Sequence, residues 1–152
     1  MGTLEFLLRN APFLSVGALL TFVSSFGQTY FISVFAGEIR AEFDLSHGDW
    51  GAIYAAGTMA SAVVMVWAGA LTDVFRVRHL ALFVLAGLAV ACLAMAALPA
   101  VWMLPVVIFA LRFCGQGMSS HIGTVAMARW FVAARGRALA IASLGFAFGE
   151  AF

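Results

Sequence analysis

The sequence is poor in charge and contains no lysine, so all eight of its basic residues are arginine. Charged residues make up only 10% of the 152 residues, against about 25% in soluble domains. Hydrophobic residues make up 64%, and the mean hydropathy is +1.07. A soluble fold of this length has too little interior to bury so much apolar surface. The composition therefore predicts an integral membrane protein, and the net charge of +1 without a basic run gives no sign of a nucleic-acid partner.

Metal-binding, redox and secretory signals are also missing. The two cysteines, Cys92 and Cys114, lie far apart in apolar segments, with no Cys-x-x-Cys or Cys/His spacing. We therefore expect no metal site and no cofactor. The first ten residues contain an acidic residue and a single arginine, and no small-residue cleavage site closes the apolar stretch that follows. We therefore expect no signal peptide.

Catalytic motifs are absent as well. Ser119, Ser120 and His121 place hydroxyls beside an imidazole, but adjacent residues on a helix do not face each other. No Gly-x-Ser-x-Gly turn supports an intramembrane hydrolase. We therefore do not expect an enzyme.

What the sequence does contain is a series of long apolar runs, and crossing a bilayer takes about 20 apolar residues. We expect an all-α membrane protein with spans at about residues 12–36, 50–71, 79–98, 102–128 and 136–152. Pro12 suits the first turn of the first span. The fifth run is too short to span when the sequence stops at Phe152. We therefore expect an incomplete N-terminal half of a longer protein.

Charge placement predicts the orientation in the membrane. Arginines precede the first span, lie between the second and third, and follow the fourth, whereas the loop at residues 38–49 is acidic. Because arginine-rich loops stay cytoplasmic, we expect a cytoplasmic N-terminus and a multi-pass protein of the cell membrane, such as a bacterial inner membrane. Within the acidic loop, we expect Ser46 or Asp49 to cap the second span.

Small residues predict close helix packing. Gly17, Thr21, Ser25, Thr29 and Ser33 recur every four residues in the first span, and Gly145 and Gly149 form a Gly-x-x-x-Gly pair in the fifth. Small residues at this spacing let two backbones approach closely in lipid. The pattern is typical of plain packing, and it is also compatible with two spans that must slide or rock.

Polar residues inside the spans predict a substrate cavity. Arg112 lies in the fourth span, and burying an arginine at a helix centre costs at least about 2.5–3.5 kcal/mol, so it needs a partner or a wet cavity. Gln116 follows one turn later. Gln28 in the first span lies at a similar depth, about 12 Å from the same membrane surface. Tyr54 and Thr58 in the second span complete the set. In this interpretation Arg112 holds an anionic substrate, or responds to an acid that carries a coupling proton. The alternative is an arginine that snorkels outward to the membrane surface or caps a neighbouring helix carbonyl.

Residues 69–78, between the second and third spans, form a short charged segment that we call the charged hinge. It resembles the cytoplasmic signature of the major facilitator superfamily, glycine-x-leucine-x-aspartate-arginine-x-glycine-arginine-arginine. Four positions match: Gly69, Leu71, Asp73 and Arg78. Three positions depart from it, with Val74, Arg76 and Val77 in place of arginine, glycine and arginine.

Three further segments resemble signatures of the same superfamily, in the right order. The first is residues 111–117, where an arginine precedes a Gln-Gly pair that comes one residue late. The second is the Arg129-Trp130-Phe131 exit with residues 135–138. The third is Gly145–Gly149, with Glu150 where proline is common. In sequence, residues 26–30 and 129–131 resemble the branch of the superfamily that contains the monocarboxylate and oxalate/formate porters.

The resemblance implies a twelve-helix secondary carrier, of which this chain holds the first five helices. Such a carrier moves a small solute by alternating access between two halves, and the second half is missing here. The resemblance also implies that Asp73 acts as an inner gate, with Arg137 or, second in order, Arg135 as its partner within the chain. The alternative is a solvated loop that only fixes topology. Two other classes stay open: an inactive truncated product, and a small subunit or channel that assembles as an oligomer.

Overall fold

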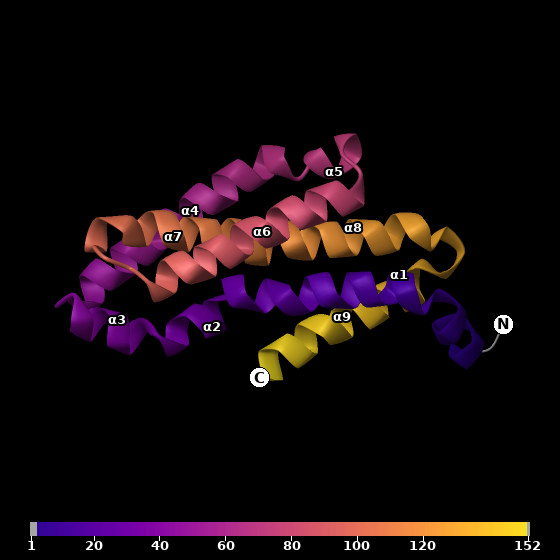
Figure 1. The fold of residues 1–152 in the computed structure, drawn as a ribbon, viewed down its shortest axis with the longest axis horizontal. Helices are drawn as coiled ribbons and strands as arrows, with labels where there is room; N and C mark the ends of the chain where they lie inside the picture. The colour runs from indigo at the N-terminus through magenta and orange to yellow at the C-terminus, as the bar shows by residue number, and fades with distance from the viewer. Residues whose placement is uncertain (1–2, 152) are drawn as a thin grey trace.

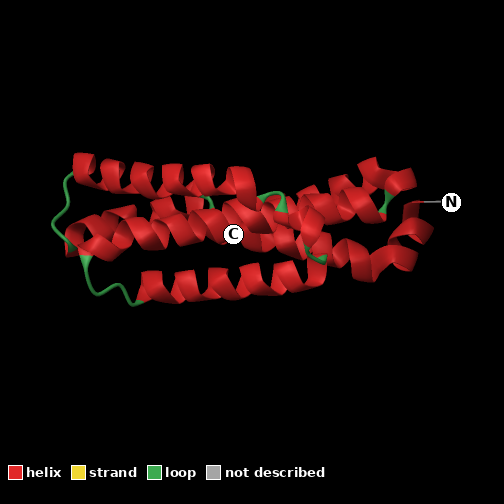
Figure 2. Cartoon of the chain, turned by 90° about the horizontal axis from the view of Figure 1, so that it is seen from above, coloured by secondary structure: helices red, strands yellow, loops and turns green. Residues whose placement is uncertain are grey.

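The computed structural model describes residues 3–151, and this part of the chain consists of helices joined by short connections, without strands (Figures 1 and 2). Its five long apolar helical segments confirm the predicted number of spans: Leu4–Val34, His47–Val74, Val77–Ala96, Val101–Trp130 and Val132–Ala151. The middle three lie within a few residues of their predicted bounds. The fifth segment has 20 residues, which is long enough to cross a membrane, so the prediction that it is too short was wrong, because the helical run begins at Val132. Its predicted end, Phe152, lies outside the described residues. The side of the membrane on which the N-terminus lies stays a prediction.

Two of the five spans are interrupted. The first consists of α1 (Thr3–Val23), a short 3-10 segment η1 (Ser24–Gly27) and α2 (Thr29–Val34). The fourth consists of η2 (Val101–Met103), α7 (Leu104–Leu111), a π-helical segment η3 (Arg112–Ser119) and α8 (Ser120–Trp130). The other spans are built from α4 (His47–Ala68) with α5 (Leu71–Val74), from α6 (Val77–Ala96), and from η4 (Val132–Ala134) with α9 (Arg135–Ala151). A short helix α3 (Ala36–Glu42) joins the first span to the second.

The predicted start of the first span was wrong. Pro12 lies inside α1, more than two turns after its beginning, and not in the first turn. A proline in a helix interior removes one backbone hydrogen bond. Here Phe6 and Leu14, on either side of Pro12, are both buried in one apolar cluster with Met127. Packing of this apolar face holds the helix together across the proline.

The N-terminus of α4 is capped as predicted. The Ser46 hydroxyl accepts a hydrogen bond from the Asp49 backbone N–H at 3.1 Å, and the Asp49 carboxylate accepts one from the Ser46 N–H at 3.1 Å. This capping box satisfies two backbone donors at the start of the second span.

Hydroxyl groups and a glycine explain the interruption of the first span. Ser24 donates a hydrogen bond to the Thr21 carbonyl at 2.6 Å, in competition with the helix ladder. After Gly27, Gln28 is extended, with φ −81° and ψ 156°. In the fourth span, Ser119 donates to the Cys114 carbonyl at 2.7 Å, five residues back, in keeping with the wide turns of a π-helix.

The two interrupted spans touch where both are irregular. A Cβ atom added to Gly27 would lie 2.8 Å from the Gly115 Cα and 2.6 Å from the Gln116 backbone nitrogen. A Cβ atom added to Gly115 would in turn lie 2.7 Å from the Gly27 Cα. Real Cβ atoms do not approach other atoms this closely, so η1 and η3 meet backbone to backbone. We call this contact the crossing, defined by Gly27 and Gly115.

Span five packs along span one through glycines, with α9 beside α1 in Figure 1. A Cβ atom on Gly145 would collide with the Ala18 carbonyl, and one on Gly149 would lie 2.9 Å from the Phe22 carbonyl oxygen. The Thr21 hydroxyl donates a hydrogen bond to the Ala142 carbonyl between them. The structure therefore places Gly145 and Gly149 in the interface between the two spans.

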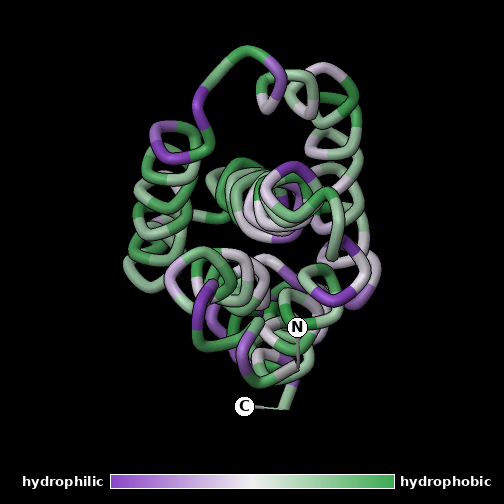
Figure 3. Tube along the Cα trace, turned by 90° about the vertical axis from the view of Figure 1, so that its right-hand side faces the viewer, coloured by the Kyte–Doolittle hydropathy of each residue, from purple (hydrophilic) through white to green (hydrophobic). Residues whose placement is uncertain are grey.

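The apolar residues lie on both the inside and the outside of the bundle. Span four is central, since Leu104, Ile108, Ile122, Ala126 and Met127 are completely buried. Large side chains on the outer helices are exposed, such as Phe83 at 79% and Trp67 at 69%. Hydrophobic colour dominates along the helices in Figure 3. An exterior this apolar requires lipid around it, so the chain is a multi-pass membrane protein.

Candidate functional site

Arg112 is buried where the two interrupted spans cross. Its side chain is only 9% exposed. Nη1 donates hydrogen bonds to the Gly27 carbonyl at 3.2 Å and to the Thr29 hydroxyl at 3.1 Å. These two partners flank the extended residue Gln28, where the helix ladder of span one is broken. Arg112 therefore caps the end of η1 and ties the fourth span to the first.

Tyr54 of α4 completes this group. Its ring centroid lies 5.7 Å from Arg112 Cζ, a cation–π distance. Its hydroxyl lies 3.0 Å from the Thr29 Oγ1. Three spans thus contribute one residue each to a polar cluster, which we call the Arg112 cluster and define as Thr29, Tyr54 and Arg112.

The remaining predicted cavity residues lie near this cluster but do not bond to it. The Gln28 side chain is half-buried, between two residues that Arg112 contacts, and no described residue forms a hydrogen bond with it. Thr58 lies one turn after Tyr54, with a buried hydroxyl that is unpartnered among residues 3–151. Gln116 contributes its backbone to the crossing, whereas its side chain is exposed. The structure therefore brings Arg112 and Tyr54 together, and leaves Gln28, Thr58 and Gln116 around them.

The charge of Arg112 is not balanced by an acid. Within the described residues the one ion pair between side chains joins Arg129 to Asp73, far along the fourth span. The partners of Arg112 are a carbonyl, a hydroxyl and an aromatic ring, all neutral. Its Nε is buried without a hydrogen-bond partner. The guanidinium therefore keeps an unused donor and a charge without a counter-ion.

The charged hinge forms a second polar site. Arg129, at the end of α8, forms an ion pair with Asp73 of α5, and its Nη1 donates to the Thr72 carbonyl. One guanidinium thus holds both a carboxylate and a backbone carbonyl of the hinge. The pair lies at the surface, with side-chain exposures of 68% for Asp73 and 46% for Arg129.

The expected partners of Asp73 within the chain were Arg137 and Arg135, and the structure corrects this. Arg135 donates its Nε to the Ala128 carbonyl at 3.1 Å. Arg137 lies with Cζ 4.8 Å from the ring centroid of Phe6, in a cation–π contact between α9 and α1. Arg129 reaches Asp73 because the fourth span ends level with the hinge, whereas Arg135 and Arg137 begin the fifth span on the other side of the turn. Arg78 is exposed, and its side chain forms no hydrogen bond or ion pair with a described residue.

Gly69 lies at the end of α4, where two side chains bind its carbonyl. The Thr72 hydroxyl donates to it at 2.9 Å, and the Nε2 of His121 lies 3.2 Å away. His121 therefore braces the second span against the fourth. Ser119 bonds to Cys114 instead, so the hydroxyl and imidazole of this segment have separate partners and form no catalytic pair.

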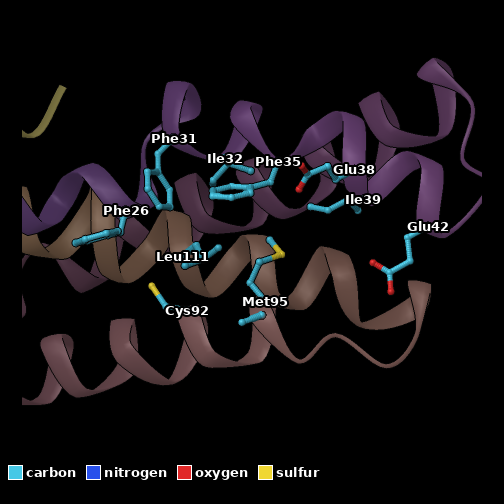
Figure 4. Close-up of a pocket in the computed structure, with 11 residues that line it drawn as sticks. Phe26, Phe31, Ile32, Phe35, Glu38, Ile39, Glu42, Cys92, Met95 and Leu111 are labelled. Carbon is cyan, nitrogen blue, oxygen red and sulfur yellow. The ribbon is translucent and has the colours of Figure 1, made fainter. Parts of the chain in front are cut away.

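An apolar cavity of about 380 Å³ lies apart from both polar sites (Figure 4). Phe26, Phe31 and Phe35 form a ladder of edge-to-face contacts along one wall, with centroid spacings of 5.1 and 5.4 Å. Cys92 and Met95 of α6 lie opposite, and two carboxylates, Glu38 and Glu42, lie at one end. None of the predicted cavity residues lines it.

Comparison with known proteins decides the family. The family model described as Major Facilitator Superfamily matches residues 17–152, which is most of the chain. The chain belongs to the major facilitator superfamily. No curated protein and no solved structure is a significant match.

Both polar sites lie within the matched part of this superfamily member, and the family supports secondary transport of small solutes across a membrane. Sequence reasoning missed two residues of these sites. Thr29 was assigned only to a packing stripe, although it directly follows Gln28. Arg129 was recognised as the exit of the fourth span, but not as a partner of Asp73.

Proposed function

We propose that this chain takes part in secondary active transport of a small organic anion, such as a monocarboxylate, by alternating access. The observation that carries the proposal is Arg112, a buried guanidinium in a membrane span whose partners among the described residues are all neutral. Polar and charged groups inside membranes are costly, and they mark substrate or ion pathways. A carboxylate would supply the missing counter-charge and would bind a guanidinium with strong, charge-assisted hydrogen bonds.

The alternative interpretation of Arg112, as a helix cap, is compatible with this role. The hydrogen bond to the Gly27 carbonyl uses one N–H of Nη1, and Thr29 accepts the other. Nη2 has no partner among residues 3–151 and is left for a ligand. Arg112 can therefore fix the broken first span and bind a solute at the same time. Family membership and the position of the cluster between three spans support transport over a purely structural role.

The second part of the proposal concerns the hinge. We infer that the ion pair of Asp73 with Arg129 belongs to an inner gate that closes against a second half of the carrier. We assign Gly69 and Arg78 of the hinge to the same gate, together with Arg135 and Arg137 of the fourth-to-fifth turn. An oligomeric subunit or an inactive product has no specific observation in its favour.

The test is transport by the reconstituted protein. Arg112→Ala is expected to abolish uptake of labelled monocarboxylates into proteoliposomes, and Arg112→Lys to restore only part of it, since an ammonium lacks the planar fork. The matched control is Arg76→Ala, at an exposed arginine of the hinge. Normal transport by Arg112→Ala would overturn the role of Arg112. Asp73→Asn is expected to slow transport, and an unchanged rate would favour a hinge that only fixes topology.

A further inference from the structure

The hydroxyl groups of the Arg112 cluster leave one proton without a partner. Thr29 Oγ1 lies 3.1 Å from Arg112 Nη1 and 3.0 Å from the Tyr54 hydroxyl. A guanidinium only donates, so the Thr29 oxygen accepts from Arg112. Thr29 and Tyr54 have two hydroxyl protons, and the hydrogen bond between them uses one. The other has no acceptor among the described residues.

The unused donors of the cluster belong to two chemical groups. Both N–H groups of Nη1 are engaged, by Gly27 and Thr29, while Nη2 is free. The spare hydroxyl proton lies within one hydrogen bond of the same guanidinium. A ligand that accepts hydrogen bonds on two oxygens, as a carboxylate does, satisfies both donors together.

Exposure differs among the three residues of the cluster. Arg112 is 9% exposed, Tyr54 is half-buried and Thr29 is exposed. The two residues that carry hydroxyl groups are therefore more accessible than the guanidinium that they contact, and they are suited to select the solutes that bind there.

We propose that Thr29 and Tyr54 determine specificity at the Arg112 site. Their spare hydroxyl proton donates a hydrogen bond that is stronger to a carboxylate than to an uncharged isostere of the same shape. This inference rests on the proposed function, because it takes Arg112 as the binding group. It adds two residues with a stated role and a substrate class: solutes with a carboxylate, in preference to the matching amide. The hydrogen bond to a charged carboxylate is stronger than that to a neutral amide, by about fivefold in affinity.

The experiment uses two probes of almost the same shape, trifluoroacetate and trifluoroacetamide. Their binding to the purified chain in detergent is measured by fluorine NMR line broadening, as a ratio of the two affinities. Thr29→Val keeps the shape of the side chain and removes the hydroxyl, and Tyr54→Phe keeps the ring over Arg112. Each single variant keeps one hydroxyl proton without a partner, so its carboxylate-to-amide ratio is expected to change little. The double variant Thr29→Val/Tyr54→Phe has no hydroxyl proton left and is expected to lower the ratio by about fivefold. Thr29→Ser combined with Tyr54→Phe keeps one hydroxyl group and is expected to keep the ratio, which a merely structural loss would not predict.

Tyr30→Phe is the matched control, since it removes the hydroxyl of a neighbouring tyrosine whose oxygen is buried and unpartnered. Its ratio is expected to equal that of the unmodified protein. Carboxylate binding that needs Arg112 but keeps its ratio in the double variant Thr29→Val/Tyr54→Phe would overturn this inference and leave the proposed function standing. Binding of trifluoroacetate that does not depend on Arg112 would overturn both.

Discussion

The crossing and the charged hinge each hold an arginine of the fourth span, and the two arginines are treated in opposite ways. At the crossing, Arg112 is buried and its partners are neutral. At the hinge, Arg129 is exposed and has a carboxylate partner. Burying a charge without a counter-ion costs free energy, and binding of an anionic ligand offsets this cost. An exposed ion pair contributes little free energy and therefore holds two segments together only weakly and reversibly. The contrast favours binding at the first site and gating at the second.

The largest effect is expected at the crossing, from Gly27→Ala. An added Cβ would lie 2.6 Å from the Gln116 nitrogen and 2.8 Å from the Gly115 Cα, where only backbone is available to move. Overpacking of this kind costs about 3 kcal/mol. The measurement is the free energy of unfolding in mixed micelles.

Gly37→Ala serves as the control, because nothing lies within 4 Å of a Cβ added there. It is expected to leave stability unchanged or slightly raised, as alanine favours helices. Equal stabilities for the two variants would show that the spans do not meet backbone to backbone.

The second prediction separates the structural and functional roles of Arg112. Replacing it with Met leaves the Gly27 carbonyl without its hydrogen bond, at a cost of about 1–3 kcal/mol. It also removes a buried charge that costs about 2.5–3.5 kcal/mol. The two changes oppose each other, so the stability of Arg112→Met is expected to stay within about 2 kcal/mol of the original.

Carboxylate binding by this variant is expected to disappear, because methionine has no donor. Leu111→Met, at the neighbouring buried position, is the control for the substitution itself. A variant that unfolds together with its loss of binding would contradict a separable binding role.

Much of this arrangement was predictable from sequence, because lipid exposure imposes long apolar runs. The five spans and the cap at Ser46 followed from hydropathy and local patterns. The interruptions at η1 and η3 did not follow. Hydropathy reports which residues avoid water, and it does not report whether a turn bonds to the third, fourth or fifth residue back.

Partners far apart in sequence were the other limit. The sequence offers several arginines as partners of Asp73, and only the tertiary structure, which brings Arg129 at the end of α8 to α5, selects Arg129. Thr29 shares its spacing with a stripe of packing residues, so its contact with Arg112 depends on the extended conformation of Gln28. Tertiary geometry decides both cases.

A smaller effect is expected at the hinge. Exposed ion pairs contribute about 0.2–1 kcal/mol, so a double-mutant cycle of Asp73→Asn with Arg129→Gln should give a coupling free energy in this range. The coupling should weaken in concentrated salt, since screening acts on exposed charges. Coupling well above 1 kcal/mol would show that the hinge resembles the crossing, and would remove the contrast between the two sites.

The smallest effect is expected for Arg137 and Asp73, the pair that the sequence predicted: their coupling free energy should be close to zero. Arg137 lies over Phe6 and contacts neither Asp73 nor Arg129 in the described part of the chain. Arg137→Gln should lower stability by about 0.5–1 kcal/mol through the lost cation–π contact. Combined with Asp73→Asn, its effect should be additive, because the two side chains share no partner. A measurable coupling between Arg137 and Asp73 would mean that the gate exchanges arginine partners, with Arg129 holding Asp73 in one state and Arg137 in the other.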